Sequence, residues 1–133
     1  MCIEYMRDVL VTPEQLAELY RDSGLRRPVD DIERMAKMIQ HANLTFSAWQ
    51  GDRLVGYARA FSDFCFATYL SDLAVAEHCK RLGIGKRLIE LVSAAISPDS
   101  MLLLLSAPDA MTYYPHVGFE EVKNGWIIHR IDR

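Results

Sequence analysis

Hydrophobic residues recur with a helical period in three parts of the chain. The first part starts at Thr12-Pro13-Glu14-Gln15, which predicts an N-cap, a first-turn proline and a capping box, and it ends before Gly24. The second follows Asp30 as the predicted N-cap, and the third follows Gly83. The apolar positions of these predicted helices are Leu16, Leu19 and Tyr20; Ile32, Met35, Ala36 and Ile39; and Ile84, Leu88, Val92 and Ile96.

Other segments favour β-strands. Leu44, Phe46 and Ala48 alternate with polar or aromatic positions, and Gly51-Asp52 predicts a tight turn into a partner strand at 54–61. Further strands are predicted at 3–6, 68–75, 101–105, 119–122 and 126–131, with a short helical turn at 109–114. Segment 101–105 is apolar on both faces, as is typical of a central, parallel strand. The element order predicts an α/β fold, with one mixed sheet in a single domain spanning residues 1–133.

Composition and net charge limit the possible classes of function. The chain has 133 residues, 50% of them hydrophobic and 25% charged, which is typical of a globular protein. A net charge of −3 disfavours a nucleic-acid coat or an anionic membrane as partner, so any anion site must be local. No apolar segment approaches the roughly 18 residues that span a bilayer, and residues 1–7 lack the order of a signal peptide. We therefore expect a cytoplasmic protein with no membrane partner.

The cysteines give no support for a metal site. Cys2, Cys65 and Cys79 cannot all pair with one another, and no C-x-x-C spacing occurs. Reduced thiols and the absence of a metal cofactor are the simplest expectation.

The loop before the third predicted helix carries the strongest chemical signal. It contains four cations (Lys80, Arg81, Lys86 and Arg87) and no acid, at a helix start where the dipole disfavours cations. Because free N–H groups at a helix start bind phosphate, a polyanion would resolve this conflict. Glycines at 83 and 85 would let the backbone approach such a ligand closely. The alternative is a glycine turn with a solvated basic face. A Rossmann fingerprint is excluded because Leu88 stands where its third glycine is required, and a Walker loop is excluded because Lys80 stands where its first glycine is required.

Two motifs resemble those of the GNAT N-acetyltransferase superfamily. Leu73-Ala74-Val75 followed by Lys80-Arg81-Leu82-Gly83-Ile84-Gly85-Lys86 is similar to its acetyl-CoA-binding motif, and Tyr113-Tyr114-Pro115-His116-Val117-Gly118-Phe119 to its second signature. The resemblance implies the acyl-CoA N-acyltransferase fold, with a mixed sheet splayed at the cofactor strand. It also implies an N-acetyltransferase that uses acetyl-CoA and an amine acceptor. The chain departs from the family at Lys80, where Gln or Arg is usual, and at Ala107, where Asn is frequent.

The resemblance also implies a set of site residues. The backbone of Leu73, Ala74 and Val75 would hold the pantetheine arm, and the amides of 82–86, with Lys80 and Arg81, the pyrophosphate. Tyr114 would protonate the departing thiolate, although packing is its alternative role. Asp72 is the best-placed base for the amine, or else a strand-end carboxylate, and His116 is a weaker candidate base. These cofactor-binding candidates are Leu73, Ala74, Val75, Lys80, Arg81, Leu82, Gly83, Ile84, Gly85 and Lys86.

The acceptor and the partners are less defined. In this fold the acceptor site is walled by segments matching 21–27 and the aromatic residues Phe61, Phe64, Phe66 and Tyr69. The aromatics could line an amine pocket, form a dimer contact in a possible homodimer, or pack in the core. Arg26 and Arg27 could meet an acidic acceptor or belong to a solvated loop. The main rival function is a non-catalytic acyl-CoA sensor; a nucleic-acid-binding protein conflicts with the net charge.

Overall fold

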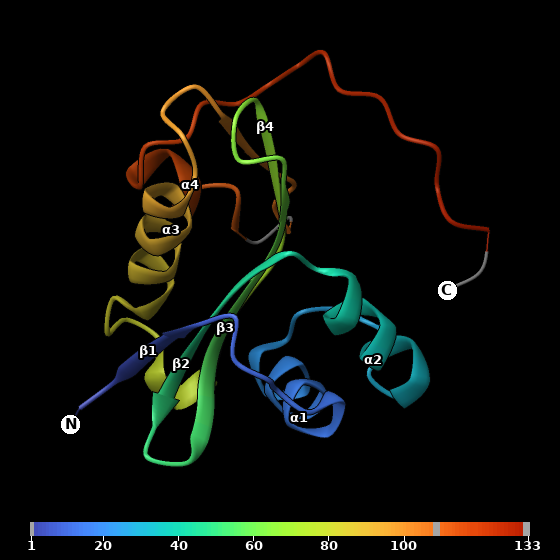
Figure 1. The fold of residues 1–133 in the computed structure, drawn as a ribbon, viewed down its shortest axis with the longest axis vertical. Coiled ribbons are helices and arrows are strands. Elements are labelled where there is room, and N and C mark those ends of the chain that lie inside the picture. Colours follow the sequence, from blue (N-terminus) through green and yellow to red (C-terminus); the bar gives the residue numbers. More distant parts are fainter. Residues whose placement is uncertain (1, 108–109, 132–133) are drawn as a thin grey trace.

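The computed structural model describes residues 2–107 and 110–131 (Figure 1). Its elements, in chain order, are β1 (Glu4–Arg7), α1 (Pro13–Ser23), α2 (Ile32–His41), β2 (Leu44–Gln50), β3 (Arg53–Ser62), β4 (Ala67–Val75), η1 (Glu77–Cys79), α3 (Ile84–Ala95), β5 (Met101–Leu104) and α4 (Tyr113–His116).

One mixed sheet organises the molecule. Its strands lie in the order β1-β2-β3-β4-β5. The first three pairings are antiparallel, and β4 and β5 are parallel. Figure 1 shows α1 and α2 on one side of the sheet and α3 and α4 on the other. The mixed α/β sheet expected from the sequence is therefore confirmed, including the parallel pairing of segment 101–105.

The local signals set the helix starts. Thr12 caps α1 with both bonds of a capping box, as predicted, and Gly24 ends the helix in the left-handed conformation (φ +83°). The predicted cap of α2 is wrong by one residue. Asp31, not Asp30, accepts a hydrogen bond from the Arg34 N–H, because it directly precedes the first helical residue and its carboxylate reaches the first turn. Asp30 instead pairs with Arg21 at 3.0 Å.

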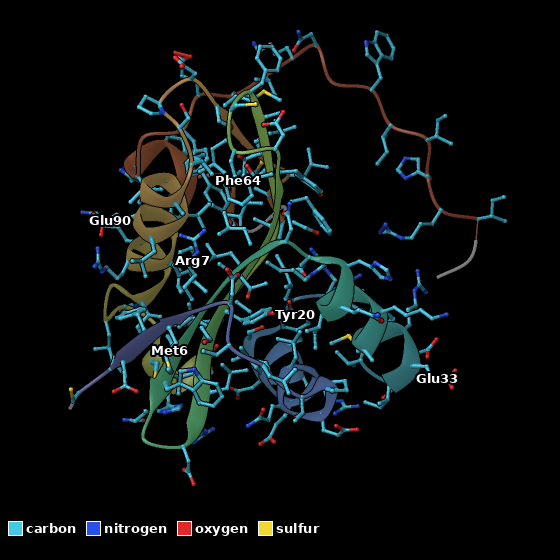
Figure 2. All side chains as sticks on the ribbon, in the orientation of Figure 1. Met6, Arg7, Tyr20, Glu33, Phe64 and Glu90 are labelled. Carbon is cyan, nitrogen blue, oxygen red and sulfur yellow. The ribbon has the colours of Figure 1, made fainter. Side chains whose placement is uncertain are left out.

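The core fills both sides of the central strands. Side chains of α1, Tyr20 among them, lie against the sheet in Figure 2. On the other side α3 approaches so closely that a Cβ at Gly56 would lie 2.9 Å from Ile84 Cγ2. The fully buried side chains include Leu16, Tyr20, Met35, Leu44, Val55, Tyr57, Ile84, Leu88 and Val92. This packing holds β3 and β4 rigidly between the two helical layers.

The structure departs from the sequence prediction after β5. The strands predicted at 119–122 and 126–131 are wrong, since the described residues of both segments are neither helix nor strand and 120–131 are exposed. Local residue preference favours a strand at these positions, but a strand is stable only when a neighbouring strand pairs with it, and none does so in the described sheet. As a result β5, predicted to be central, is an edge strand of the described sheet. The predicted helical turn at 109–114 starts at Asp109, which lies outside the described residues, and α4 begins at Tyr113.

No helix in the described part of the chain has both the length and the apolar character needed to cross a membrane.

Candidate functional site

Strands β4 and β5 separate halfway along β4. They pair only from Ala67 with Met101 to Leu70 with Leu104, so residues 71–75 have no strand from the described part of the chain beside them on that edge. On the other edge the Ala76 N–H donates to the Val55 carbonyl at 2.8 Å, in register with β3. Antiparallel alternation then directs the N–H and C=O of Leu73 and Val75 to the open edge. The backbone groups of Ala74 face Tyr57 on β3, so two of the three predicted residues offer free backbone groups.

A β-bulge marks the point of separation. Asp72 lies opposite Arg59 and Leu70 opposite Ala60, which leaves Ser71 as the extra residue of β4. The Ser71 carbonyl accepts a hydrogen bond from Arg27 Nη2 at 2.8 Å. Arg27 therefore fixes the bulge at the residue that follows the last β4–β5 pair.

The loop from β4 into α3 presents uncapped N–H groups. Arg81 and Gly83 are both left-handed (φ +72° and +82°), and Gly83 is an N-cap with no side-chain hydrogen bond. The first helical bond runs from the Arg87 N–H to the Gly83 carbonyl at 3.0 Å. The N–H groups of the residues between them point out of the helix start. These N–H groups form a set of donors suited to an anion.

The four cations of the loop differ in their contacts. Lys80 Nζ lies 2.8 Å from Glu77 and donates to the Ser23 carbonyl at 3.1 Å. Arg87 lies 3.8 Å from Glu90. Arg81 and Lys86 are exposed and form no ion pair with the residues that the structure describes. Two of the predicted cations are thus available to a ligand without breaking a contact.

Helix α4 brings the second motif to the first. A Cβ at Gly85 would lie 3.3 Å from the Tyr113 hydroxyl and 3.7 Å from Val75 Cγ2, so Tyr113 lies over the start of α3. The Tyr114 ring is half-buried and meets the rings of Tyr113 and Phe119 edge to face, at 5.1 and 5.6 Å between centroids. Burial, and secondarily Tyr113, raises the pKa of Tyr114. Its hydroxyl therefore stays protonated at neutral pH.

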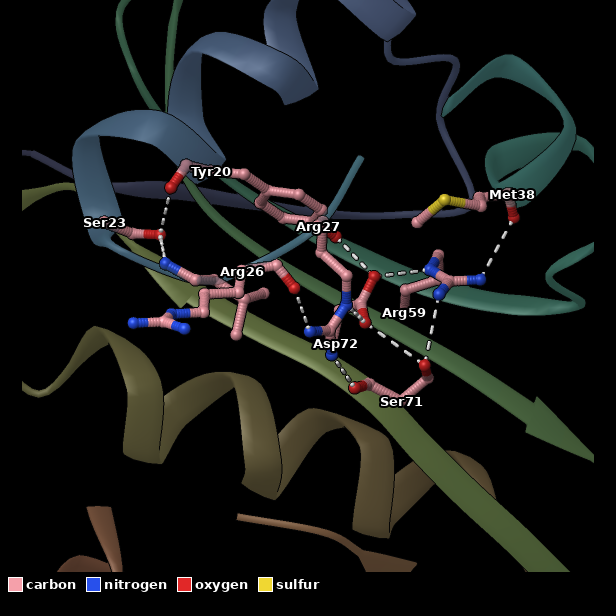
Figure 3. Close-up of polar contacts among 9 residues, drawn as sticks. Tyr20, Ser23, Arg26, Arg27, Met38, Arg59, Ser71 and Asp72 are labelled. Atoms are coloured by element: carbon pink, nitrogen blue, oxygen red, sulfur yellow. Dashed lines mark hydrogen bonds and ion pairs between the residues drawn. The ribbon is translucent and has the colours of Figure 1, made fainter. Parts of the chain in front are cut away.

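Asp72 lies in a buried polar cluster (Figure 3). Its Oδ1 accepts from Arg27 Nε at 2.6 Å and from Ser71 Oγ at 3.1 Å. Its Oδ2 accepts from Arg59 Nε at 2.6 Å and from the Tyr20 hydroxyl at 2.8 Å. Burial opposes the charged carboxylate, but the hydrogen bond and charge of Arg59 and the charge of Arg27 outweigh it and lower the pKa of Asp72.

This cluster changes the interpretation of two residues. A general base needs a free lone pair within reach of the substrate's proton, whereas both Asp72 oxygens already accept two hydrogen bonds each. Arg27, expected in a solvated loop or at an acidic acceptor, instead holds the buried carboxylate, while Arg26 is exposed. His116 is also exposed, on α4.

Sequence reasoning missed three residues of the cluster, namely Tyr20, Arg27 and Arg59, as partners of Asp72. One signal was available: Arg59 lies in the mainly apolar interior of β3, whereas the other charge of the strand, Arg53, is its exposed first residue. A charge in such an interior needs a buried counter-ion. The four aromatic residues predicted to line the acceptor site differ in burial: Phe64 and Phe66 are exposed, whereas Phe61 and Tyr69 are half-buried. No group of three His, Cys, Asp or Glu side chains suited to a metal occurs among the described residues.

Comparison with known proteins gives the family and the fold of the chain. The family profile of the acetyltransferase (GNAT) domain matches residues 16–128, and the chain belongs to this family. Two curated relatives are described as uncharacterized N-acetyltransferases ycf52. The protein from Porphyra purpurea is 27% identical over 130 residues, covering 90% of this chain and 75% of the relative. The one from Pyropia yezoensis is 26% identical over 129 residues, covering 90% and 74%.

Solved structures share the fold. A Staphylococcus aureus protein of unknown function described as a probable acetyltransferase has a TM-score of 0.82 at 19% identity, covering 97% of this chain and 100% of its own. A GNAT family acetyltransferase from Streptococcus pneumoniae has a TM-score of 0.78 at 22% identity, covering 97% and 99%. The aminoglycoside N-acetyltransferase AAC(6')-Iy, solved with CoA, has a TM-score of 0.71 at 16% identity, covering 98% and 95%.

Proposed function

We propose that this protein is an acetyl-CoA-dependent N-acetyltransferase that acetylates a primary amine by direct attack. The supporting observation is the continuity of two binding surfaces. The open edge of β4, at Leu73 and Val75, leads directly into the uncapped N–H groups at the start of α3. A long ligand with an amide-containing arm at one end and a diphosphate at the other fits this sequence of groups.

Different residues of the chain would bind different parts of acetyl-CoA. Leu73 and Val75 would hydrogen-bond the arm as an added strand. The amides of residues 82–86, with the side chains of Arg81 and Lys86, would hold the diphosphate. Lys80 would join them after leaving Glu77. When bound, acetyl-CoA supplies an activated acetyl group, and a free backbone N–H on β4 is the donor that would stabilise negative charge on its carbonyl oxygen.

Tyr114 is the proposed proton donor to the leaving thiolate. Its raised pKa keeps the hydroxyl protonated. A thiol with an ordinary pKa near 8.5 is a stronger acid than this phenol, so full proton transfer is uphill and the hydrogen bond itself gives most of the stabilisation. Tyr114 acts here as a hydrogen-bond donor first.

We assign Asp72 a positioning role in this proposal, in place of general base. By holding Arg27 and Arg59, it fixes the bulge at Ser71 and hence the direction of the Leu73 backbone. The amine is then deprotonated by a group other than Asp72, such as water bonded to backbone carbonyls.

The test is thiol release from acetyl-CoA with a panel of primary amines. At least one amine should give turnover, and Tyr114→Phe should lower kcat at least tenfold while the Kd for CoA stays within twofold, because only the hydroxyl is removed. Tyr5→Phe, on β1 at the edge of the sheet opposite to β5, is the matched control and should keep full activity. Unchanged turnover in Tyr114→Phe would remove Tyr114 from the mechanism.

A second candidate is a non-catalytic acyl-CoA-binding module. The occupied carboxylate of Asp72 favours it, since the one acid of β4 is not free to serve as a base. Micromolar CoA binding with no turnover of any amine in the panel would support this candidate and exclude the enzyme. The absence of CoA binding would exclude both.

A further inference from the structure

The open edge of β4 determines where an acceptor amine has to arrive, and this step rests on the proposed function. With the diphosphate at the start of α3 and the arm beside Val75 and Leu73, the acyl end of acetyl-CoA points toward Ser71. It cannot extend further along β4, because β5 pairs with Leu70 and the residues before it. The acceptor amine must therefore reach the acetyl group next to Ser71.

The polar cluster at this point holds more positive than negative charge. Arg27 Nε and Arg59 Nε each lie 2.6 Å from a different oxygen of Asp72, so two guanidinium groups share one carboxylate. The hydroxyl of Tyr20 adds no charge, because burial and the neighbouring Asp72 raise its pKa well above the ordinary value. One positive charge is therefore left over, in a cluster where the side chains of Asp72 and Arg59 are 0% and 8% exposed. A charge in such surroundings needs a counter-ion.

The excess charge is available to a ligand at Arg27. The guanidinium of Arg59 is enclosed, since it also donates to the Met38 carbonyl at 3.3 Å and to Ser71 Oγ at 3.1 Å. The side chain of Arg27 is 27% exposed, and its Nη1 and Nη2 donate to the carbonyls of Arg26 and Ser71 (Figure 3). Each of these two nitrogens carries two N–H groups. Arg27 therefore keeps one N–H group on each of them for a ligand, without breaking any of these contacts.

The acidic residues of the same loop are engaged elsewhere. Asp30 pairs with Arg21 at 3.0 Å, and Asp31 caps α2 by accepting from the Arg34 N–H. Arg26, in contrast, is exposed and forms no ion pair with a residue that the structure describes. An ammonium group would therefore meet positive charge from the loop and from the cluster, whereas a carboxylate would be attracted by both.

We propose that the acceptor is an α-amino acid, whose carboxylate binds Arg27 with help from Arg26 and whose amine is acetylated. Hydrogen bonds between guanidinium and carboxylate groups are short and strong, and the planar guanidinium fixes the direction of the carboxylate. Because one carbon atom joins the amine of an amino acid to its carboxylate, binding at Arg27 keeps the amine next to Ser71. In the transfer the amine nitrogen bonds to the acetyl carbon as the carbon–sulfur bond breaks. Of the two protons that an ammonium group loses, one goes to the leaving thiolate and one to water.

Binding to the CoA-saturated protein tests the carboxylate without turnover. The probes are glycine, alanine, leucine, phenylalanine and glutamate, each compared with its own α-amide, which lacks the negative charge of the α-carboxylate. In ligand-detected nuclear magnetic resonance titrations, at least one amino acid should bind at least tenfold more tightly than its amide. Equal binding in every pair, or no binding of any amino acid, would overturn the proposal. Tighter binding of the amides would also overturn it and would favour the α-amine of a peptide as acceptor.

Two arginine variants locate the carboxylate. Arg26→Gln leaves the contacts of Asp72 intact and should reduce the preference for the acid over its amide about threefold, with the Kd for CoA within twofold of the wild type. Arg27→Gln should abolish the preference, and thermal unfolding checks that this variant folds. If it does not fold, Arg26→Gln alone decides. Arg53→Gln, at the exposed first residue of β3, is the matched control and should leave the preference unchanged. An unchanged preference in the arginine variants of the loop would overturn the proposal.

Turnover with the same probes separates this inference from the proposed activity. Acetylation of amines with no preference for a carboxylate would overturn the inference and leave the enzyme in place. A binding preference for amino acids without any thiol release would exclude the enzyme and leave the carboxylate site in place. A higher kcat/KM for an amino acid than for its amide would support both.

Discussion

The polar groups on the two sides of β4 differ in whether they have hydrogen-bond partners. On the side of α1, Asp72 is saturated by Arg27, Arg59, Tyr20 and Ser71, and no buried side-chain nitrogen or oxygen in the described residues lacks a partner. On the edge toward β5 and at the start of α3, backbone donors are left open. A saturated polar cluster stabilises the fold, whereas open donors at a strand edge and a helix start are available to a ligand. The predictions below separate these two roles.

The largest effect is expected at the saturated cluster. Asp72→Asn removes the charge that neutralises two arginines and should lower the free energy of unfolding by about 3–5 kcal/mol, the usual cost of breaking a buried ion pair. Denaturant unfolding measures this loss. Asp30→Asn removes the exposed pair with Arg21 and is the matched control, with an expected loss below about 1 kcal/mol. Equal losses in the two variants would show that the cluster does not stabilise the fold.

The glycines at 24 and 83 allow a sharper comparison. Both are left-handed, with φ of +83° and +82°, and neither has an atom within 4 Å of an added Cβ. Alanine at either position should therefore cost a similar 1–2 kcal/mol of stability from backbone strain. Only Gly83→Ala disturbs the donors at the start of α3, so it alone should weaken CoA binding, by about tenfold, in calorimetry. An equal loss of CoA affinity in Gly24→Ala would mean that lower global stability, and not the donors at the start of α3, causes the weaker binding.

Local signals account for what the sequence predicted well. The capping box at Thr12, the turn at Gly51-Asp52 and the loop at Gly83 each depend on residues a few positions apart, and the elements beside them lie where they were expected. The two motifs also identified the loop and the tyrosine pair that the fold brings together. This part of the candidate site could be predicted because its residues lie at short, fixed spacings in the sequence.

Long-range contacts account for what was missed. Three partners of Asp72 are 13, 45 and 52 residues away along the chain, so no spacing links Arg59, Arg27 and Tyr20 to it. Strand pairing has the same property: the residues at 126–131 favour a strand locally, but they do not show whether a neighbouring strand will pair with them. Burial and pairing of this kind are set by the three-dimensional arrangement of the chain.

A smaller effect is expected from one cation of the open site. Lys86→Gln removes an exposed charge without breaking an ion pair in the described part of the chain, and should weaken CoA binding about threefold to fivefold, as expected for a partly screened contact. The loss should shrink in high salt, which screens exposed charges. Lys37→Gln, on the exposed side of α2, should leave the affinity unchanged. Titration at two salt concentrations distinguishes these outcomes.

The smallest effect at ordinary pH concerns the protonation of Asp72. The pKa of Asp72 in the folded protein lies below the ordinary value near 3.9. The stability that Asp72 contributes is therefore fully present at pH values above about 3.9, and it is lost as the pH falls through the pKa of the folded protein. Stability should therefore show no change from Asp72 between pH 7 and pH 5 and should fall below about pH 4.

Asp63 contributes to the same acid loss, since hydrogen bonds from the backbone N–H groups of Ala67, Cys65 and Phe66 lower its pKa too. The difference in unfolding free energy between the wild type and Asp72→Asn isolates Asp72, because Asp63 is present in both. That difference should narrow as the pH drops below 4. If the variant is too unstable to measure, the carboxyl-carbon resonance of Asp72 in the wild type gives its titration directly. A midpoint above 4, or a gap that persists unchanged into acid, would mean that the arginines do not hold this carboxylate in its charged form.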